Sequence, residues 1–179
     1  MYSYTDITAE KIADGAEKAI EQARAVLDES VAPKDARTFQ NTLMPVDRVG
    51  DILAHAFAEY AFMGFVHTDA AVRKAGNEAQ EKLESFGVEM IFRDDLNAAV
   101  QEYAETDEAN ALEGEKARFL EFLLRDLRRA GHQLAPEVRA AVKEKTQRLV
   151  ELGVRFQNNI DEWSDHILVD HDELDGLPR

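Results

Sequence analysis

The chain has 179 residues, no cysteine and a formal net charge of −15, and its length is that of one ordinary domain. The missing cysteine excludes disulfides, thiolate metal sites and cysteine nucleophiles, and it fits a reducing, cytoplasmic setting. The acidic charge argues against nucleic acid, because phosphate backbones select faces rich in lysine and arginine. The nearest basic group, Arg125, Arg128 and Arg129, stands among acids and is predicted to lie on the solvated side of a helix.

The sequence shows no pattern for membrane insertion or export. No apolar run approaches the roughly 20 residues that a helix needs to span a bilayer. Met1 to Asp6 lacks the basic and apolar regions of a signal peptide. We therefore expect no membrane partner and a cytoplasmic location.

Apolar residues recur every three or four positions through the first part of the chain, which predicts helices. Thr8 is a good N-cap for the first helix, which ends at the break formed by residues 31–35. The second helix begins near Thr38 and continues to Met63. Pro45 lies inside its apolar pattern and is predicted to start or kink the helix.

Four further helices are predicted in the rest of the chain. The third follows the cap Asp69, and the fourth runs from about Asp94 to Tyr103. The fifth contains Phe119 to Ala130 and stops at Gly131, a common C-terminal signal. Pro136 opens a sixth helix of about 27 residues. Its apolar markers are Val138, Val142, Leu149, Leu152, Phe156, Ile160 and Trp163.

Short links between these segments indicate an all-α fold. We expect about six mostly antiparallel helices in a bundle or helical layer, followed by a short extended C-terminal segment. Only His166–Val169 resembles a strand. Linkers stay below about eight residues and no repeat of about 34 or 40 residues is evident, so residues 1–179 are predicted to form a single helical domain.

The histidines do not form a zinc-hydrolase motif. Such enzymes need two histidines on one helical face, usually as His-Glu-x-x-His, with a third ligand elsewhere. No two histidines are four residues apart: His55, His67, His132, His166 and His171. Three acids near the last two, Asp165, Asp170 and Asp172, could add only a weak metal site. A solvated acidic tail is the favoured interpretation.

Serine and carboxylate chemistry also lacks a motif. No serine stands in a Gly-x-Ser-x-Gly turn: Ser3, Ser30, Ser85 and Ser164. Asp94 and Asp95 most simply favour the positive end of the fourth helix. An aromatic set could line a groove, although core packing is favoured: Phe57, Tyr60, Phe62 and Phe65. We therefore predict no catalytic residue, no cofactor-binding residue and no metal ligand in this chain.

Five strings of residues stand in a fixed order along about four fifths of the chain. They are Thr38–Leu43 continuing to Asp47; Val66–Asp69 through Val72, Arg73, Leu83, Phe86 and Arg93 to Leu96; Leu123–Leu127 with Arg129–Gly131; Leu149, Leu152, Phe156, Asn159 and Ile160; and Glu173–Pro178. In this order they resemble the thimet oligopeptidase family of zinc metallopeptidases. That family includes oligopeptidase A and the bacterial dipeptidyl carboxypeptidases.

The resemblance implies an N-terminal helical domain that forms one wall of a deep channel for short, unfolded peptides. In the family the zinc motif lies in the C-terminal half, and no family metal ligand or general base maps onto a position here. The expected partners are short peptides and the catalytic half of a parent enzyme, which would hold the zinc. The isolated chain is expected to be inactive and to self-associate through an uncovered apolar face. Two alternatives are a free-standing module that binds or regulates a partner, and a purely structural helical domain.

Overall fold

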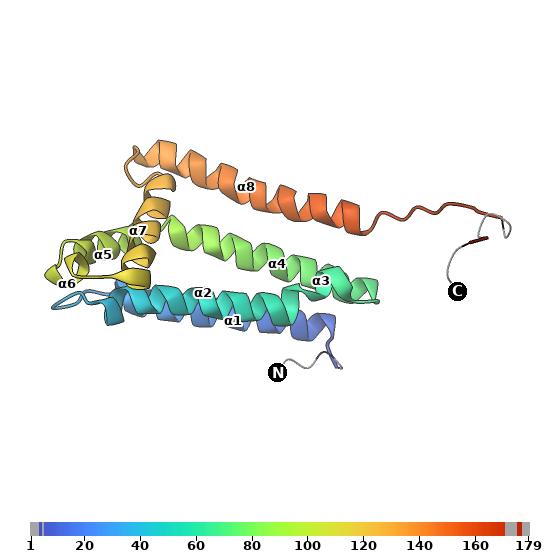
Figure 1. The fold of residues 1–179 in the computed structure, drawn as a ribbon, viewed down its shortest axis with the longest axis horizontal. Helices are drawn as coiled ribbons and strands as arrows, with labels where there is room; N and C mark the ends of the chain where they lie inside the picture. The colour runs from blue at the N-terminus through green and yellow to red at the C-terminus, as the bar shows by residue number, and fades with distance from the viewer. Residues whose placement is uncertain (1–3, 5, 171–174, 177–179) are drawn as a thin grey trace.

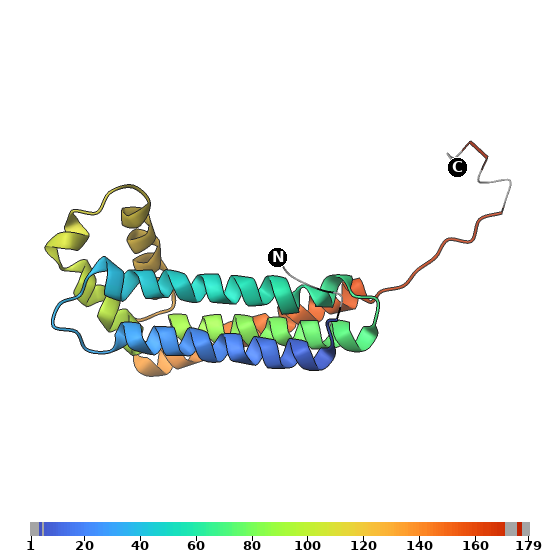
Figure 2. The ribbon, with the colours of Figure 1, turned by 90° about the horizontal axis from the view of Figure 1, so that it is seen from below.

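The computed structural model describes Tyr4, residues 6–170 and residues 175–176. Its elements are helices joined by short connections, and no strand occurs within those residues. Helix α1 (Ala9–Val31) lies against both α2 (Met44–Ala56) and α4 (Ala70–Ile91), so the three form a long layer (Figures 1 and 2). Successive long helices alternate in direction, whereas α1 and α4 run the same way (Figure 1). The predicted all-α class is confirmed.

The remaining helices close one end and one side of this layer. Helices α5 (Asp94–Ala104), α6 (Asp107–Asn110) and α7 (Gly114–Arg129) form a lobe at one end, and α7 runs across the long helices (Figure 2). Helix α8 (Pro136–Asp161) then returns along α4 (Figure 1). The segment after α8 is extended and projects from the body, as the sequence predicts.

Local capping chemistry sets the helix ends. The Thr8 hydroxyl accepts a hydrogen bond from the Lys11 amide at 3.2 Å, and the Asp69 carboxylate accepts one from the Ala71 amide at 2.7 Å. Gly131 takes a φ of 88° just after α7, a conformation that glycine adopts without a steric penalty. These boundaries match the prediction. Helix α6 was not predicted, because the acidic stretch that forms it reads as a simple helix end.

The second predicted helix is continuous, but it widens twice. Two π-helical turns flank α2, namely η1 (Phe39–Leu43) and η2 (Phe57–Ala61), and α3 (Met63–Val66) follows. Pro45 lies in the first turn of α2, which confirms the expected start. Just before it, the Met44 amide donates to the Phe39 carbonyl five residues back. Such a wider turn relieves the crowding that a proline ring imposes on the preceding helical turn.

By length and composition alone, the segment Phe39–Val66 is apolar enough to cross a membrane. The expectation that no stretch approaches a spanning length is therefore wrong for this segment. Its apolar residues have another use, since Leu43, Val46 and Val49 lie in the core with side chains from α5 and α7. A core helix passes the same compositional test.

Two clusters of buried side chains make up the core. One joins α1, η1, α2 and α4 to the lobe, and its fully buried members include Leu27, Leu96 and Leu127. The other joins the first half of α1 to α3 and α4. In this second cluster the backbones approach closely, because a Cβ on Gly76 would lie 2.3 Å from the Gly64 nitrogen. Two glycines therefore let α3 dock on α4.

Helix α8 matches its predicted length, and most of its apolar residues lie outside the core. Only Val154 is buried, at the middle of the face that meets α4. The larger apolar side chains point away, and Leu149, Phe156 and Trp163 are 67%, 67% and 74% exposed. Ion pairs hold both ends of the helix: Arg139 contacts Asp94 at 2.7 Å, and Arg73 contacts Glu162 at 2.7 Å.

Candidate functional site

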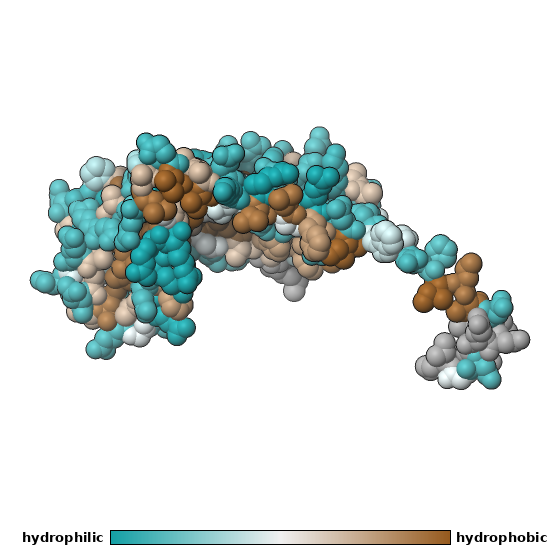
Figure 3. All heavy atoms as spheres, turned by 90° about the horizontal axis from the view of Figure 1, so that it is seen from above, coloured by the Kyte–Doolittle hydropathy of each residue, from teal (hydrophilic) through white to brown (hydrophobic). Residues whose placement is uncertain are grey.

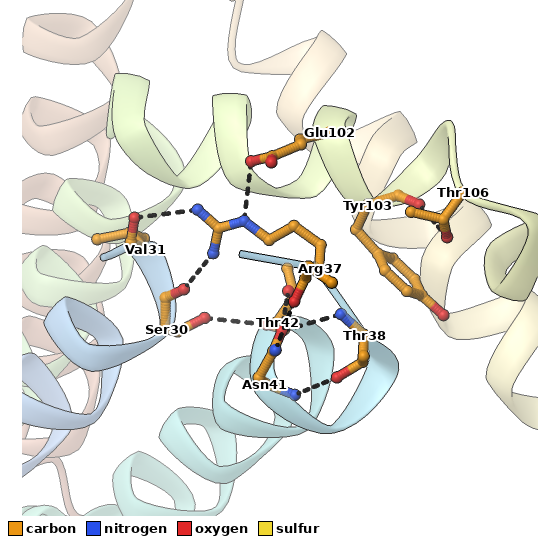
Figure 4. A network of polar contacts seen from close by, with 10 residues as sticks. Ser30, Val31, Arg37, Thr38, Asn41, Thr42, Glu102, Tyr103 and Thr106 are labelled. Atoms are coloured by element: carbon orange, nitrogen blue, oxygen red, sulfur yellow. Dashed lines mark hydrogen bonds and ion pairs between the residues drawn. The ribbon is translucent and has the colours of Figure 1, made fainter. Parts of the chain in front are cut away.

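Arg37 organises the connection between α1 and η1. Its guanidinium is buried and donates to the carbonyls of Ser30 at 2.7 Å and Val31 at 3.3 Å, while its Nε donates to Glu102 at 2.9 Å (Figure 4). The last carbonyls of a helix lack partners within the helix and carry partial negative charge, so a cation is favourable there. Arg37 thus ends α1, orients residues 32–38 and links them to α5.

The string that begins at Thr38 builds the next helix start. The Asn41 amide donates to the Thr38 hydroxyl at 3.2 Å, and the Thr38 amide donates to the Asn41 side chain at 2.9 Å (Figure 4). These reciprocal bonds form a capping box, which satisfies two amides that a helix start leaves free. The Ser30 hydroxyl donates to the Thr42 carbonyl at 3.0 Å and ties this start to α1.

The lobe contacts the same helix start. Both carboxylate oxygens of Glu108 lie 3.3 Å from the Phe39 amide nitrogen, and the Lys116 ammonium stands 4.8 Å from the centre of the Phe39 ring. Tyr103 is fully buried beside this junction, and its hydroxyl has no hydrogen-bond partner among the residues that the structure describes. Burial raises the pKa of Tyr103, and the negative charge of Glu108 raises it further, so the phenol stays neutral.

A groove of about 800 Å³ lies between the second half of α1 and the start of α2. Gln40, Asn41 and Asp47 belong to the recognised string and line this groove, whereas Phe39 and Leu43 of the same string are buried. The string therefore has a structural face and a groove face. The other lining residues are Val26, Glu29, Ser30, Lys34, Met44, Pro45, Arg48, Gly50, Asp51 and Ala54.

The groove is suited to binding rather than to bond cleavage. It offers side-chain amides, carboxylates and two cations, Lys34 and Arg48, around the exposed side chain of Met44. Such a mixture can hydrogen-bond a peptide backbone and accept side chains of either charge. No histidine and no thiol lines it. Among the residues that the structure describes, no three histidines or carboxylates gather as a metal site requires, so zinc does not fit this part of the molecule.

The histidines are dispersed over the described part of the chain. His55 is exposed with its ring 3.1 Å from the Asp51 carboxylate, and His67 accepts from the Asp69 amide at 3.0 Å. His132 is buried and contacts the Ile91 carbonyl at 2.9 Å and the Asp94 carboxylate at 3.4 Å, so it serves packing at the α7–α8 joint. His166 is exposed, while His171 and Asp172, which belong to the weak metal site considered at the C-terminal end, lie outside the described residues.

The serines and paired acids are occupied structurally or exposed. Ser30 is buried in the Arg37 network, Ser85 is half-buried in α4, and Ser164 is exposed. Asp94 and Asp95 open α5, as predicted. Ser3 lies outside the described residues, as do most residues of the string Glu173–Pro178.

The aromatic set does not pack wholly in the core as favoured. Phe57 and Tyr60 are half-buried, but Phe62 and Phe65 are exposed, with ring centres 6.4 Å apart. The cause is η2, where the Phe62 amide donates to the Phe57 carbonyl five residues back. One extra residue in that turn rotates the following side chains by about a quarter of a turn. Periodicity of 3.6 residues cannot reveal this shift.

Arg93 and Arg73 form ion pairs that lower the pKa of a neighbouring carboxylate. The Arg93 guanidinium contacts Asp95 at 2.6 Å and Asp28 at 2.5 Å, and it lowers the pKa of Asp95 by hydrogen bonding. Arg73 likewise lowers the pKa of Glu162 by hydrogen bonding. Both sites join helix ends, so they position the helices. The predicted basic group on α7 is solvated: Arg125 pairs with Asp126 at 2.8 Å.

Comparison with known proteins supports the resemblance carried by the strings. A thimet-like oligopeptidase of Dictyostelium discoideum is 25% identical over 154 residues, which are 82% of this chain and 22% of the relative. A protein of Arabidopsis thaliana named probable thimet oligopeptidase is 26% identical over 97% of this chain and 24% of its own length. Oligopeptidase A of Escherichia coli is 24% identical over 98% and 26%, respectively. No family model matches the chain.

The chain is thus an all-α domain whose sequence is similar to part of proteins named as oligopeptidases. Over most of its length the chain is similar to thimet oligopeptidases and to oligopeptidase A, at 24% to 26% identity. It spans about a quarter of the length of these relatives. The similarity extends along nearly the whole chain and does not depend on any single string.

Proposed function

We propose that residues 1–179 form a substrate-channel wall of a longer, zinc-dependent oligopeptidase that cleaves short peptides in the cytoplasm. The supporting observation is the extent of the match: relatives named as oligopeptidases align with nearly all of this chain but only a quarter of themselves. The single helical domain would be an N-terminal part of that parent enzyme. The remainder of the parent would hold the zinc and supply the catalytic groups.

The domain would act in two ways: it would restrict sterically what enters the channel, and it would bind the peptide. The Arg37 network and the capping box hold the start of α2 in one orientation, so that Gln40 and Asp47 line a fixed groove. A rigid wall would exclude folded proteins, while groove side chains would contact an extended peptide. No residue of this chain takes part in a bond-breaking step. When bound in the remainder, zinc would polarise the scissile carbonyl and activate water.

The test compares the isolated chain with the parent enzyme on a quenched fluorescent peptide. We expect no turnover by the chain alone and chelator-sensitive turnover by the parent. In the parent, replacing Gln40 and Asp47 with alanine should lower kcat/KM about three- to tenfold through a higher KM. Glu115→Ala, an exposed change on α7 away from the groove, is the control and should have no effect. Equal kinetics for both variants would remove the groove from substrate binding.

A free-standing partner-binding module is the second candidate, because α8 exposes a long apolar stripe. The coding sequence separates the two candidates. A reading frame that continues into a His-Glu-x-x-His motif supports the channel wall, and a stop after residue 179 supports the module.

A further inference from the structure

An apolar stripe follows the outer face of α8 and continues beyond it. Its members recur at spacings of three and four residues, which places them on one face of the helix. They are Leu149, Leu152, Phe156 and Ile160; Trp163 follows just beyond the end of the helix, and all five are exposed. The extended segment adds Ile167, Leu168 and Val169, also exposed. Figure 3 looks onto the side that carries α8 and shows apolar patches along the body and again in the projecting segment.

The size of these exposed side chains indicates that the stripe contacts another surface. The inner face of α8 buries Val154, whereas the outer face carries Phe156, with Trp163 just beyond the end of the helix. A surface helix normally places its larger apolar groups inward. From Leu149 to Ile160 the stripe extends over about 17 Å, at about 1.5 Å per residue. Isolated apolar residues on a surface need no explanation, but a continuous stripe of this length does.

The orientation of the stripe is fixed by polar contacts at both ends of α8. Arg139 binds Asp94 at the start, and Arg73 binds Glu162 at the end with two hydrogen bonds of 2.7 and 3.1 Å. Turning the stripe inward would break both ion pairs and expose Val154. The ion pairs therefore keep the outer face of α8 exposed to solvent.

Charges beside the stripe indicate what covers it. Lys145, Arg148 and Arg155 stand on the middle of α8, where Arg148 pairs with Glu151, in a chain whose net charge is −15. Residues 161–170 carry four acids and no lysine or arginine. A complementary surface would be apolar, with acidic groups opposite the middle of α8 and basic groups opposite its end. A second copy of the chain brings its own charge of −15, which opposes self-association.

We infer that the outer face of α8, with Ile167–Val169, is the docking surface for the remaining polypeptide of the parent oligopeptidase. The inference rests on the proposed function, and the relatives supply the occupant, since about three quarters of their length lies outside the match. The groove between α1 and α2 is then a separate surface that stays open to peptide. One domain would carry a permanent contact on α8 and a transient one on α2.

The experiment measures the accessibility of single cysteines, because this chain has none of its own. Leu149→Cys and Phe156→Cys report on the stripe, and Met44→Cys in the groove is the matched control. Maleimide labelling rates are compared between the isolated chain and the parent enzyme, with cysteines outside residues 1–179 replaced by serine. We expect labelling at positions 149 and 156 to slow at least about tenfold in the parent, and labelling at position 44 to change little.

Equal labelling rates at position 156 in both proteins would overturn the inference, as would a stop codon after residue 179. Light scattering supplies the competing outcome, since a stable dimer of the isolated chain that protects the stripe would assign the face to a second copy. Peptide hydrolysis by the parent is recorded separately. Hydrolysis with an unprotected stripe rejects only the docking face, and a protected stripe without hydrolysis rejects only the peptidase function.

Discussion

Helices α7 and α8 follow one another in the chain and show the same kind of apolar periodicity, yet they end in opposite environments. Helix α7 buries Leu120, Leu123 and Leu127 in the core cluster that it shares with α5 and the long helices. Helix α8 buries Val154 alone. The comparison shows that periodicity reveals a face that needs a partner, but it does not reveal whether the partner lies within these residues.

The same substitution in the two helices should give the largest contrast. Leu127→Ala empties a fully buried position and should lower the free energy of unfolding by about 2–5 kcal/mol. Leu149→Ala removes a side chain that is 67% exposed and should change it by less than about 0.5 kcal/mol. Urea denaturation followed by circular dichroism measures both. Similar losses would mean that the stripe on α8 is buried in solution.

Replacing a buried arginine and an exposed arginine should give a second contrast in stability. Arg37→Ala removes the donor from one buried and one half-buried carbonyl at the end of α1 and should cost about 2–3 kcal/mol. Arg148→Ala on α8 removes only an exposed pair with Glu151 and should cost less than about 0.5 kcal/mol. Thermal unfolding of both variants provides the check. A mild Arg37 variant would show that water satisfies those carbonyls.

Replacing each of two glycines of α4 with alanine should change stability in opposite directions, because one is closely packed and the other is open. Gly76→Ala forces a methyl group into the backbone of α3 and should destabilise the domain by about 1–3 kcal/mol. Gly87→Ala meets nothing within 4 Å and should stabilise it by about 0.5–1 kcal/mol through helix propensity. Opposite signs in urea denaturation are the expected result. Stabilisation by both would show that α3 does not dock as described.

Removing the hydroxyl of Tyr103 should have a smaller effect on stability, and the effect should not be a loss. Because this buried group has no hydrogen-bond partner, Tyr103→Phe should leave stability unchanged or raise it by up to about 1 kcal/mol. The control is Tyr60→Phe, at a half-buried ring. Denaturant midpoints compare the two variants. A clear loss at position 103 would reveal a bound water that the hydroxyl requires.

The smallest expected effect is acid loosening of the end of α8. Arg73 lowers the pKa of Glu162, so this pair stabilises the fold above the ordinary glutamate pKa and is lost as pH falls through the lowered value. Fluorescence anisotropy of Trp163, the only tryptophan, should therefore decrease below about pH 4. Arg73→Gln should show the lower anisotropy at neutral pH and no acid step.

Much of the fold could be predicted because its determinants are local. The capping residues Thr8 and Asp69, the proline at the start of α2 and the glycine after α7 each act within a few residues of a helix end. The groove could be predicted only indirectly, through the string Thr38–Leu43. That pattern does not show that Gln40 faces a groove while Phe39 enters the core.

The sequence by itself determined the helices, their ends and the relationship to oligopeptidases. The tertiary structure alone decided three things: the buried role of Arg37, the outward turn of Phe62 and Phe65, and the exposed stripe on α8. The physical reason is the distance along the chain over which each kind of interaction acts. Capping and periodicity depend on neighbours within one or two turns, whereas burial depends on which distant helix arrives to cover a face, and for α8 only its smaller apolar face met one.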